Sequence, residues 1–453
     1  MDFDFKRPFF DQFRQLQLKV PRPPLVNNKS ENSDFCNFSD WNRNSYLITS
    51  ANRNEDSYYG FCLVDNKNAV DCLWCVNSQL LYECTDCSSC YNLRNSANCS
   101  QCIDSAFLIN CRSLSNCMFC VNLRNRQYCI FNKQYSKEEY LKKEKELLEG
   151  SHLNYLGLKE KFREFLRMTP IRKANNFVSS ENVQGDNIFN SKNAYGVFDV
   201  YDVNDCAYAH DGLSARDCQD IEFFEGTELC YESTSLCGRR YTFTIFCRNS
   251  ANLLYCDNCH GCSDCFGCVG LRNKKFCVFN RQYSKEEYEE LVPRIIEYMK
   301  GTGEWGEFFP IKYSIFAYNE TLAQDYFPLA KEEALERGYP WHDDAQKQQQ
   351  IQSFTVPDHI RDATDLIAGQ LLRCSCGKNF KVIRQELDFY RGMNIPVPRS
   401  CPDCRHRNRM MQRNQGSLYD RACAKCKAPI RTTYAPDRTE TVYCEKCWLE
   451  AVY

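Results

Sequence analysis

The sequence predicts a mainly β protein built from two duplicated Cys-rich solenoid-like modules, each followed by a helix, and a C-terminal double zinc-ribbon/treble-clef module. Three observations support this fold class. The chain repeats itself at an offset of 148 residues, cysteines recur every twelve residues inside each repeat, and the last 80 residues hold four close cysteine pairs. Thirty-two cysteines among 453 residues are too many for an ordinary cytosolic enzyme, so cysteine is the informative residue type.

Composition and charge exclude several classes of protein. With 57 Lys and Arg against 59 Asp and Glu, the net charge of -2 excludes a globally basic nucleic-acid coat. The chain has no apolar run long enough for a transmembrane helix, and its first residues contain no apolar stretch typical of a signal peptide. We therefore expect no membrane association and a reducing, cytoplasmic location, where clustered thiols bind metal or pack as small apolar groups more often than they form disulfides.

The larger repeat defines the modules. Between residues 117–140 and 265–288, sixteen of 24 aligned positions are identical. We divide the chain into an N-terminal lead segment (1–29), a first Cys-rich repeat module with a helical cap (30–172), a second such module (173–300), an aromatic-rich connector (301–344), a flexible linker (345–357) and a double zinc-binding module (358–453).

Within each module the cysteines follow a three-residue grid. Cys75, Cys87, Cys99 and Cys111 are twelve residues apart, and every cysteine of the first module except Cys62 lies at a multiple of three. A strand alternates faces every two residues and a helix drifts off such a grid, so neither element fits. The pattern favours a narrow solenoid with a coil of about twelve residues, its corners supplied by Asn, Ser, Asp and Gly. Short antiparallel hairpins stapled by metal are the alternative.

Each module ends in a helix with a recognisable start. Ser136–Glu139 and Ser284–Glu287 both read as capping boxes, and a further helix is expected over residues 156–168. A short helix is expected over residues 330–337, stopped by Gly338. The apolar stripe predicted for the helix after Ser136 consists of Leu141, Leu147 and Leu148.

Two zinc sites are predicted near the C-terminus. Zinc prefers four soft ligands in a tetrahedron, and two residues between paired cysteines form the turn that presents both thiolates. The second site has the zinc-ribbon spacing, whereas the first departs from it because one of its pairs has a single intervening residue. A cross-braced pairing, or His406 in place of one cysteine, is left open. The predicted ligands are Cys374, Cys376, Cys401 and Cys404 for the first site, and Cys423, Cys426, Cys444 and Cys447 for the second.

The dense positive patch of the chain follows the first zinc site. It contains the candidate nucleic-acid contacts Arg405, Arg407, Arg409, Arg413, Lys425 and Lys427. Guanidinium groups grip phosphate oxygens bidentately, so phosphate contact is the functional interpretation. The alternative is a solvated helix face that balances thiolate charge or binds an acidic protein surface.

The cysteines of the modules need no metal to be explained. Reduced cysteine packs as a small hydrophobe, so a structural core is the preferred interpretation. Bound zinc, an iron-sulfur cluster and disulfides are the alternatives, and His260 is the one histidine with a plausible ligand position. No catalytic constellation is recognised, and the pair His210 and Asp211 is read as a surface pair. The sequence favours a non-enzymatic protein, without excluding catalysis, and identifies no small-molecule substrate.

Several phrases together resemble an uncharacterised Cys-rich, zinc-ribbon-containing family of candidate-phyla bacteria with small genomes, some members of which are labelled as CaiB/BaiF-type CoA-transferases. The resemblance covers nearly the whole chain and implies zinc binding, and members often carry a further zinc ribbon before the Asp-Phe segment. The phrases are Arg7-Pro-Phe-Phe, Lys19-Val-Pro-Arg-Pro, Gln134-Tyr-Ser-Lys-Glu-Glu-Tyr, Gly303-Glu-Trp-Gly-Glu-Phe-Phe-Pro, Ala317-Tyr-Asn-Glu-Thr and Cys401-Pro-Asp-Cys-Arg-His.

The sequence thus predicts a zinc-binding scaffold or adaptor with about two zinc ions, whose C-terminal module contacts nucleic acid, either RNA or DNA, or a protein partner. The alternative is a metal-handling or redox protein in which the module cysteines bind zinc or an iron-sulfur cluster.

Overall fold

The computed structural model describes residues 1–169, 171–343, 354–414 and 416–452, and strand is its predominant element. The chain divides into two compact units. The first-coil unit comprises Pro23–Ile171 and the described part of Asp344–Arg413, with the last residues of the chain. The second-coil unit comprises Met1–Arg22, Arg172–Asp343 and Asn414–Leu449. Residues 345–353, most of the expected linker, lie outside the described residues.

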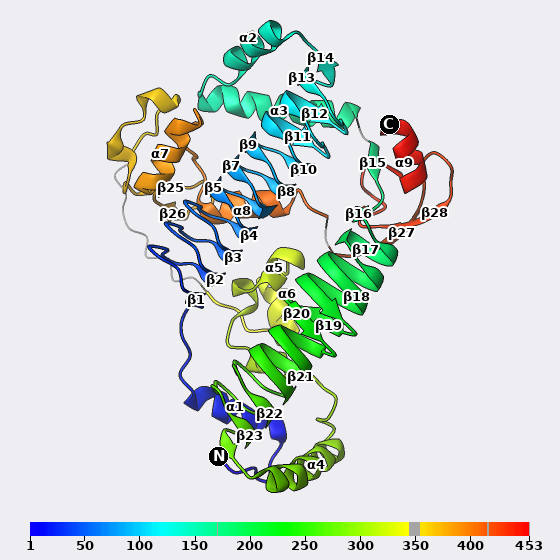
Figure 1. Cartoon of the computed structure of the whole chain (residues 1–453). Coiled ribbons are helices and arrows are strands. Elements are labelled where there is room, and N and C mark those ends of the chain that lie inside the picture. The colour runs from blue at the N-terminus through cyan, green and yellow to red at the C-terminus, as the bar shows by residue number, and fades with distance from the viewer. Residues whose placement is uncertain (170, 344–353, 415, 453) are drawn as a thin grey trace. The chain divides into compact units, whose positions relative to one another are not determined.

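In the first-coil unit the chain returns into parallel register with itself every twelve residues. Cys75 pairs with Cys87 and Cys87 pairs with Cys99, so these cysteines of the predicted series lie in one column. Figure 1 shows the stacked strands of this unit. We call residues 27–134 the first coil. Its strands are β1 (Asn27–Asn28), β2 (Asn37–Asp40), β3 (Thr49–Asn52), β4 (Phe61–Val64), β5 (Lys67–Val70), β6 (Leu73–Val76), β7 (Gln79–Tyr82), β8 (Thr85–Ser88), β9 (Tyr91–Arg94), β10 (Ala97–Ser100), β11 (Ile103–Ile109), β12 (Ser115–Val121), β13 (Gln127–Ile130) and β14 (Lys133–Gln134).

The second coil, residues 177–282, repeats this arrangement with two departures from the twelve-residue period. Val183 pairs with Ala194, an interval of eleven, and the register then shifts at Gly185. A Cβ on Gly185 would lie 1.7 Å from the Val197 carbonyl oxygen, so only glycine fits there. The same interval of eleven pairs β16 with β17 at the start of this short turn, and it recurs where β20 pairs with β21. The strands are β16 (Phe177–Val178), β17 (Glu181–Phe189), β18 (Lys192–Arg216), β19 (Gln219–Glu222), β20 (Glu225–Glu228), β21 (Tyr231–Leu254), β22 (Ser263–Phe266), β23 (Lys275–Val278) and β24 (Arg281–Gln282).

Cysteine fills the interior of both coils. Their thiols donate hydrogen bonds to backbone carbonyls of their own twelve-residue turn and of the next turn along the chain. Cys84 Sγ, for example, lies 3.5 Å from the Tyr82 carbonyl oxygen and 3.4 Å from the Leu93 carbonyl oxygen. In the earliest turns Asn replaces Cys at inward positions, where the side-chain amide of Asn54 donates to the Leu63 carbonyl and that of Asn66 donates to the Cys75 carbonyl. The core position expected for the cysteines is therefore confirmed by their burial.

Helices cover the C-terminal end of each coil. The first coil is followed by α2 (Lys137–Leu147) and α3 (His152–Met168), and the second by α4 (Lys285–Thr302). Both predicted capping boxes are present. The predicted stripe on α2 is wrong at Leu141, which is 44% exposed, because Tyr140 supplies the fully buried contact of that helix instead.

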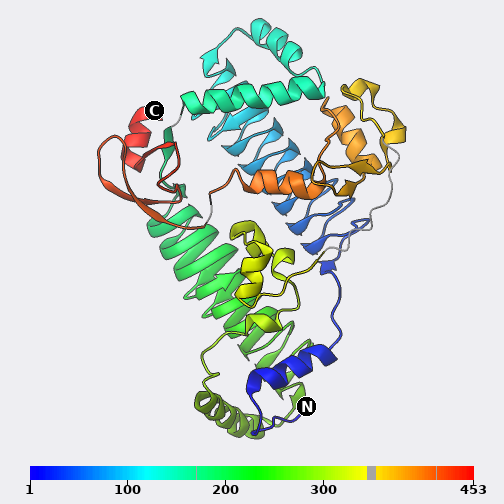
Figure 2. The ribbon, with the colours of Figure 1, turned by 180° about the vertical axis from the view of Figure 1, so that it is seen from behind.

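The N-terminal helix α1 (Phe9–Lys19) belongs to the second-coil unit, as Figure 2 shows. Phe9 and Phe13 lie in one buried cluster with Tyr255 and Phe279 of the second coil. The two oxygens of Glu304 accept from the first amides of α1, each at 2.9 Å, which satisfies donors that a helix start leaves free. Residues of α1, near the start of the chain, therefore share one hydrophobic core with residues of the second coil and α4.

The remaining elements lie in the connector and the C-terminal region. The short helix predicted at residues 330–337 is confirmed as α6. None of the helices among the described residues is long and apolar enough to cross a membrane. The elements are η1 (Ile311–Tyr313), η2 (Tyr318–Glu320), α5 (Leu322–Tyr326), α6 (Lys331–Glu336), η3 (Ile360–Asp362), η4 (Asp365–Ile367), α7 (Arg384–Gly392), α8 (Pro402–Met410) and α9 (Glu445–Val452), with short strands β15 (Ile171–Lys173), β25 (Leu372–Arg373), β26 (Asn379–Phe380), β27 (Tyr419–Ala422), β28 (Pro429–Thr432) and β29 (Thr441–Tyr443).

Candidate metal centres

The first cysteine set, which we call site A, lies in the first-coil unit between a hairpin and a helix. Cys374 and Cys376 occupy the turn between β25 and β26, and the turn closes with a hydrogen bond of 3.0 Å from the Gly377 amide to the Cys374 carbonyl. Gly377 has a φ of +89°, a conformation that L side chains rarely adopt. This glycine explains how a pair with only one intervening residue still presents both sulfurs to one side.

The other half of site A comes from the start of α8. Cys401 is the N-cap residue of α8, Pro402 is its first residue, and Cys404 follows within the first turn. Cys376 Sγ and Cys401 Sγ lie 3.7 Å apart. A hairpin turn and a helix start, 25 residues apart in the chain, therefore converge on one point.

The second set, site B, lies in the second-coil unit and repeats this plan. Cys423 and Cys426 lie in the turn between β27 and β28, where Lys427 has a φ of +63°. Cys444 and Cys447 lie at the end of β29 and in the first turn of α9. Cys426 Sγ and Cys444 Sγ are again 3.7 Å apart.

Both sets have the dimensions of a four-sulfur metal site. In each, all four sulfur atoms lie within 4.8 Å of one another. A tetrahedron with metal-sulfur bonds of about 2.3 Å has sulfur-sulfur edges of about 3.8 Å, close to the 3.7 Å between the two sulfurs measured in each site. Each set can hold one metal ion.

The backbone favours the thiolate form of one cysteine in each site. Although burial opposes ionisation, hydrogen bonds from the amides of Cys376 and Cys401 lower the pKa of Cys374 to about 6. In site B the amide of Cys444 lies 3.3 Å from Cys423 Sγ, and this contact helps to lower the pKa of Cys423 to about 6. Thiolate is the form of cysteine that binds metal, so the lowered pKa of these thiols favours binding of a cation at both sites.

The grouping resolves two alternatives that the sequence left open. The pairs combine in chain order rather than cross-braced, and each group consists of four cysteines. His406 is outside both groups, and its ring meets the ring of Phe61 edge-on, with centroids 6.3 Å apart.

Two of the predicted nucleic-acid contacts are buried instead of exposed. Arg405 Nη1 donates to Asp71 Oδ2 at 2.7 Å and to Glu386 Oε1 at 3.1 Å, and Arg409 Nη1 donates to Asp71 Oδ1 at 2.8 Å. The two arginine side chains are each 4% exposed, and those of Asp71 and Glu386 are 0% exposed. These guanidinium groups fasten α8 to the first coil, so they present no surface for phosphate.

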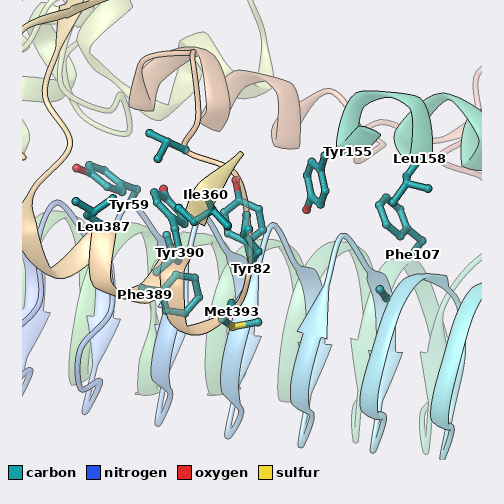
Figure 3. Close-up of a cluster of buried hydrophobic side chains, with 14 of the residues drawn as sticks. Tyr59, Tyr82, Phe107, Tyr155, Leu158, Ile360, Leu387, Phe389, Tyr390 and Met393 are labelled. Atoms are coloured by element: carbon teal, nitrogen blue, oxygen red, sulfur yellow. The ribbon is translucent and has the colours of Figure 1, made fainter. Parts of the chain in front are cut away.

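Tyrosines complete this buried network, which we call the arginine lock. The Tyr59 hydroxyl donates to Glu386 Oε2 at 2.9 Å, and the Arg405 guanidinium lies over the Tyr59 ring. The same face carries an apolar cluster in which Tyr390 of α7 meets Tyr82 of the coil and to which Leu387 of α7 also belongs (Figure 3). Burial raises the pKa of Glu386, although Arg405 opposes this shift.

The remaining members of the predicted patch are divided between the units. Arg413 makes two bonds to the Asp86 carboxylate, at 3.1 and 3.2 Å. Arg407 is exposed on α8 in the first-coil unit, whereas Lys425 and Lys427 are exposed beside site B in the second-coil unit. The cysteines of each predicted metal site are therefore brought together, whereas the predicted basic residues belong to two different units.

Sequence reasoning missed the acidic partners of the arginine lock. Asp71 lies in the first coil, more than 300 residues before Arg405, and no local pattern marks it. The one available signal is general: a charged residue in a chain that folds must be solvated or paired.

His260, the candidate ligand of the second module, lies 3.0 Å from the Asn258 side chain through Nε2, and burial helps to lower its pKa to about 4.

Comparisons with known proteins add little to this geometry. No family model and no curated protein matches the chain. Among solved structures, one labelled as an acetyltransferase from Desulfovibrio desulfuricans G20 has a TM-score of 0.12 and 7% identity, covering 62% of this chain and 81% of that chain. A likeness of this size carries no argument about fold or activity.

Proposed function

We propose that the protein is a non-enzymatic scaffold in which two structural zinc ions hold two hairpin-helix elements against two Cys-rich β-solenoid modules. The observation that carries the proposal is the pair of four-cysteine sets. Four thiolate ligands leave no open coordination position for substrate or water, and such closed sites contribute folding energy rather than catalysis. The soft, all-sulfur donor set favours zinc over magnesium or calcium.

The finer description of these elements belongs to the same proposal. A parallel register of twelve residues, kept over successive strands, supports a narrow solenoid. A hairpin turn and a helix start that share four cysteines support a treble-clef type of zinc element at each site. Membership of the Cys-rich, zinc-ribbon-containing family that the sequence resembles is also proposed.

Each zinc element is attached to its own coil by polar contacts. At site A the attachment is the arginine lock. At site B the Thr433 hydroxyl donates to Asp186 Oδ2 and the Thr432 hydroxyl to the Ala174 carbonyl, both at 2.6 Å, while Lys173 pairs with Glu445 at 2.7 Å. Zinc would therefore stabilise the two coil assemblies as well as the two small elements themselves.

The zinc content of the full chain tests this proposal. We expect about two zinc ions per chain, about one in Cys376→Ser or in Cys426→Ser, and about none in the double variant. Both positions are exposed, so the substitutions disturb packing little. Cys237→Ser, at a coil cysteine that is not fully buried, is the matched control and retains both ions. Zinc or iron well above two per chain, retained in the double variant, would favour the coil thiols as ligands and overturn the assignment.

Exposed basic residues outside the arginine lock are the basis for proposing a binding partner of the scaffold. Lys425 and Lys427 lie in the site B turn, and both are exposed. We infer that they contact the phosphates of a nucleic acid, either RNA or DNA, because lysine ammonium groups act as point charges toward phosphate. A protein surface is the alternative partner.

Binding of a mixed-sequence RNA oligonucleotide at several salt concentrations tests this contact. In the double variant Lys425→Ala, Lys427→Ala we expect weaker binding and a shallower dependence on salt, by about one unit of slope or more. Lys142→Ala, at an exposed position of α2, serves as the control. Unchanged affinity and slope in the double variant would remove nucleic acid as the partner of this surface.

A further inference from the structure

The N-terminal end of the first coil lacks a covering element among the described residues. At the other end of this coil, β14 turns back to pair antiparallel with β13, and α2 follows. The second coil begins against the site B element, through Thr432 and Thr433, and ends against α1 and α4. By contrast β1, which starts the first coil (Figure 1), pairs with β2 alone among the described strands.

The backbone of residues 27–38, which we call the first turn, leaves hydrogen-bonding groups unpaired. In the next turn, three amides donate to carbonyls of the first turn at 3.0, 3.0 and 3.2 Å: Trp41 to Asn28, Asn44 to Glu31 and Leu47 to Asp34. The equivalent amides twelve residues earlier, those of Lys29, Asn32 and Phe35, have no acceptor in the described chain. The carbonyls of Ser30 and Cys36 have no donor there either. The first turn is therefore an open edge with both donors and acceptors, a template for pairing with another chain.

Large apolar side chains are exposed at the same end. From the third turn of this coil onward, large apolar residues with positive φ are buried or half-buried. In the first two turns, however, Phe35 is 61% exposed, Trp41 57% and Leu47 40%, although all three have a φ of +50° to +60°. The second coil has two exposed residues of this kind, Tyr208 and Leu229, and both lie away from its ends. Bulky residues in this uncommon conformation thus gather, exposed, beside the open edge.

The first turn also carries charges of both signs. Lys29, Glu31 and Asp34 are exposed. The Lys29 ammonium lies over the Trp41 ring, 4.2 Å from its centroid, and neither Lys29 nor Asp34 has an ion-pair partner among the described residues. The edge therefore presents a cation and an anion that can each pair with a group of opposite charge outside this chain.

We propose that this edge is a two-fold interface with a second copy of the chain, in which the first turns of two first coils stack end to end. The unpaired amides lie three residues apart around the turn, so a single extended peptide would meet only one side of it. The end of another first coil has the same outline. A two-fold axis sets the two edges antiparallel and lets every group of one copy meet its counterpart in the other.

The positions of the charges fit this symmetry. One antiparallel register keeps the inward positions of both copies aligned, with Ser30 facing Ser33, and it sets Lys29 of each copy opposite Asp34 of the other. The same register brings Phe35 of each copy beside the column that holds Lys29 and Trp41 in the other. The interface thus contains two Lys-Asp pairs with apolar contacts beside them. A single coil end is a small contact, so we expect affinity in the micromolar range.

Sedimentation velocity of the full chain, between about 1 and 100 µM at about 0.1 M salt, tests the proposal. We expect a monomer-dimer equilibrium for the wild type. Lys29→Asp and Asp34→Lys each place like charges across the axis and should each weaken dimerisation at least tenfold. An equimolar mixture of the two variants should dimerise as the wild type does, because each Asp then faces a Lys. Lys29→Asp should fold, since Asp tolerates the φ of +50° at this position.

Matched variants separate the edge from general changes in surface charge or hydrophobicity. Phe35→Asn should also weaken dimerisation, whereas Tyr91→Asn, at an exposed aromatic position in the middle of the first coil, should leave it unchanged. Melting temperatures close to that of the wild type verify that the charge variants are folded. Three results would overturn the proposal: a wild type that is monomeric at about 100 µM, a dimer that persists in both charge variants, or a mixture of the two that remains monomeric.

Discussion

At the residue scale, the three-residue grid of cysteines has a backbone cause. In the coils a residue with φ near +50° occurs at nearly every third position, including Asp71, Trp74 and Glu83. Each of these is followed by an inward-facing cysteine, Cys72, Cys75 or Cys84. A left-handed residue other than glycine costs about 1 to 2 kcal/mol of conformational free energy. Burial of the inward cysteines and the hydrogen bonds between successive twelve-residue turns must therefore offset this cost at many positions.

This geometry also explains which residues the grid tolerates. Asn92, Asn95, Asn249 and Asn252, expected as corners, all have positive φ. Asn and Asp are enriched in this conformation, but Trp74 shows that a large side chain can occupy it when it points outward. Cys62, the exception to the grid, itself has a φ of +53°, so it occupies the left-handed position of its triplet.

The arginine lock gives a prediction at the same scale. Arg409→Met leaves Asp71 with one charged partner instead of two in a fully buried position, and we expect a loss of about 3 to 5 kcal/mol in the free energy of unfolding. Arg407→Met, two residues earlier on the exposed side of α8, should change it by less than about 0.5 kcal/mol. Urea unfolding measures both, and similar effects of the two substitutions would contradict the lock.

At the scale of elements, helix α3 is held to the first coil by a half-buried ion pair. Lys159 Nζ lies 2.5 Å from Glu83 Oε2, and the Tyr155 hydroxyl of the same helix donates to Asn95. Burial opposes the charged form of Glu83, but Lys159 lowers the pKa of Glu83 below the ordinary value of 4.5. The carboxylate therefore contributes stability above that value and loses it as the pH falls.

We expect the free energy of unfolding of the wild type to decrease between about pH 5 and pH 3 more steeply than that of Lys159→Met. Lys161→Met, at an exposed position of α3, should keep the wild-type slope. Denaturant unfolding at a series of pH values measures the difference. Parallel curves for the wild type and Lys159→Met would show that this pair does not govern the acid response.

Helix α1 makes a prediction about the second-coil unit. Phe13 is 1% exposed in the cluster that joins α1 to the second coil and α4. Phe13→Ala should cost about 3 to 5 kcal/mol by transfer and cavity terms. Hydrogen exchange should report the loss of protection in residues 243–299 and leave residues 58–165 unchanged, whereas a uniform loss would mean that the two units unfold together.

At the scale of the whole molecule, each compact unit combines one coil with one four-cysteine element. The region 358–453, expected as one double zinc-binding module, is divided between the units at Arg413 and Asn414. The duplication visible in residues 30–300 is therefore matched by two four-cysteine elements, each with its own attachment.

This organisation predicts two classes of thiol. In the folded, metal-loaded protein all the coil cysteines except Cys237 are buried, whereas Cys376 and Cys426 are exposed. A thiol reagent should react with almost no cysteine before chelation, with about eight after chelation, and with all of them only after unfolding. Rapid reaction of more than about ten thiols in the native protein would contradict the buried ladder.

The sequence by itself determined the coil period, the inward position of the cysteines, the helix starts and the two groups of four cysteines that could hold metal. Each of these features depends on residues that are close in the sequence or separated by a regular interval. A helix cap needs a residue three positions away, and each turn of a coil needs the same residue type twelve positions later. Such signals remain readable without knowing the fold.

Only the tertiary structure decided which groups the arginines contact and which residues complete the hydrophobic core of the second-coil unit. Arg405 meets Asp71, and Phe9 meets Tyr255, across separations of hundreds of residues that no local pattern encodes. The same arginine spacing suits a phosphate-binding face or a buried lock, because guanidinium groups recognise carboxylate and phosphate alike. Which of the two it serves depends on the surface against which the helix packs, and the packing of the first coil supplied a carboxylate.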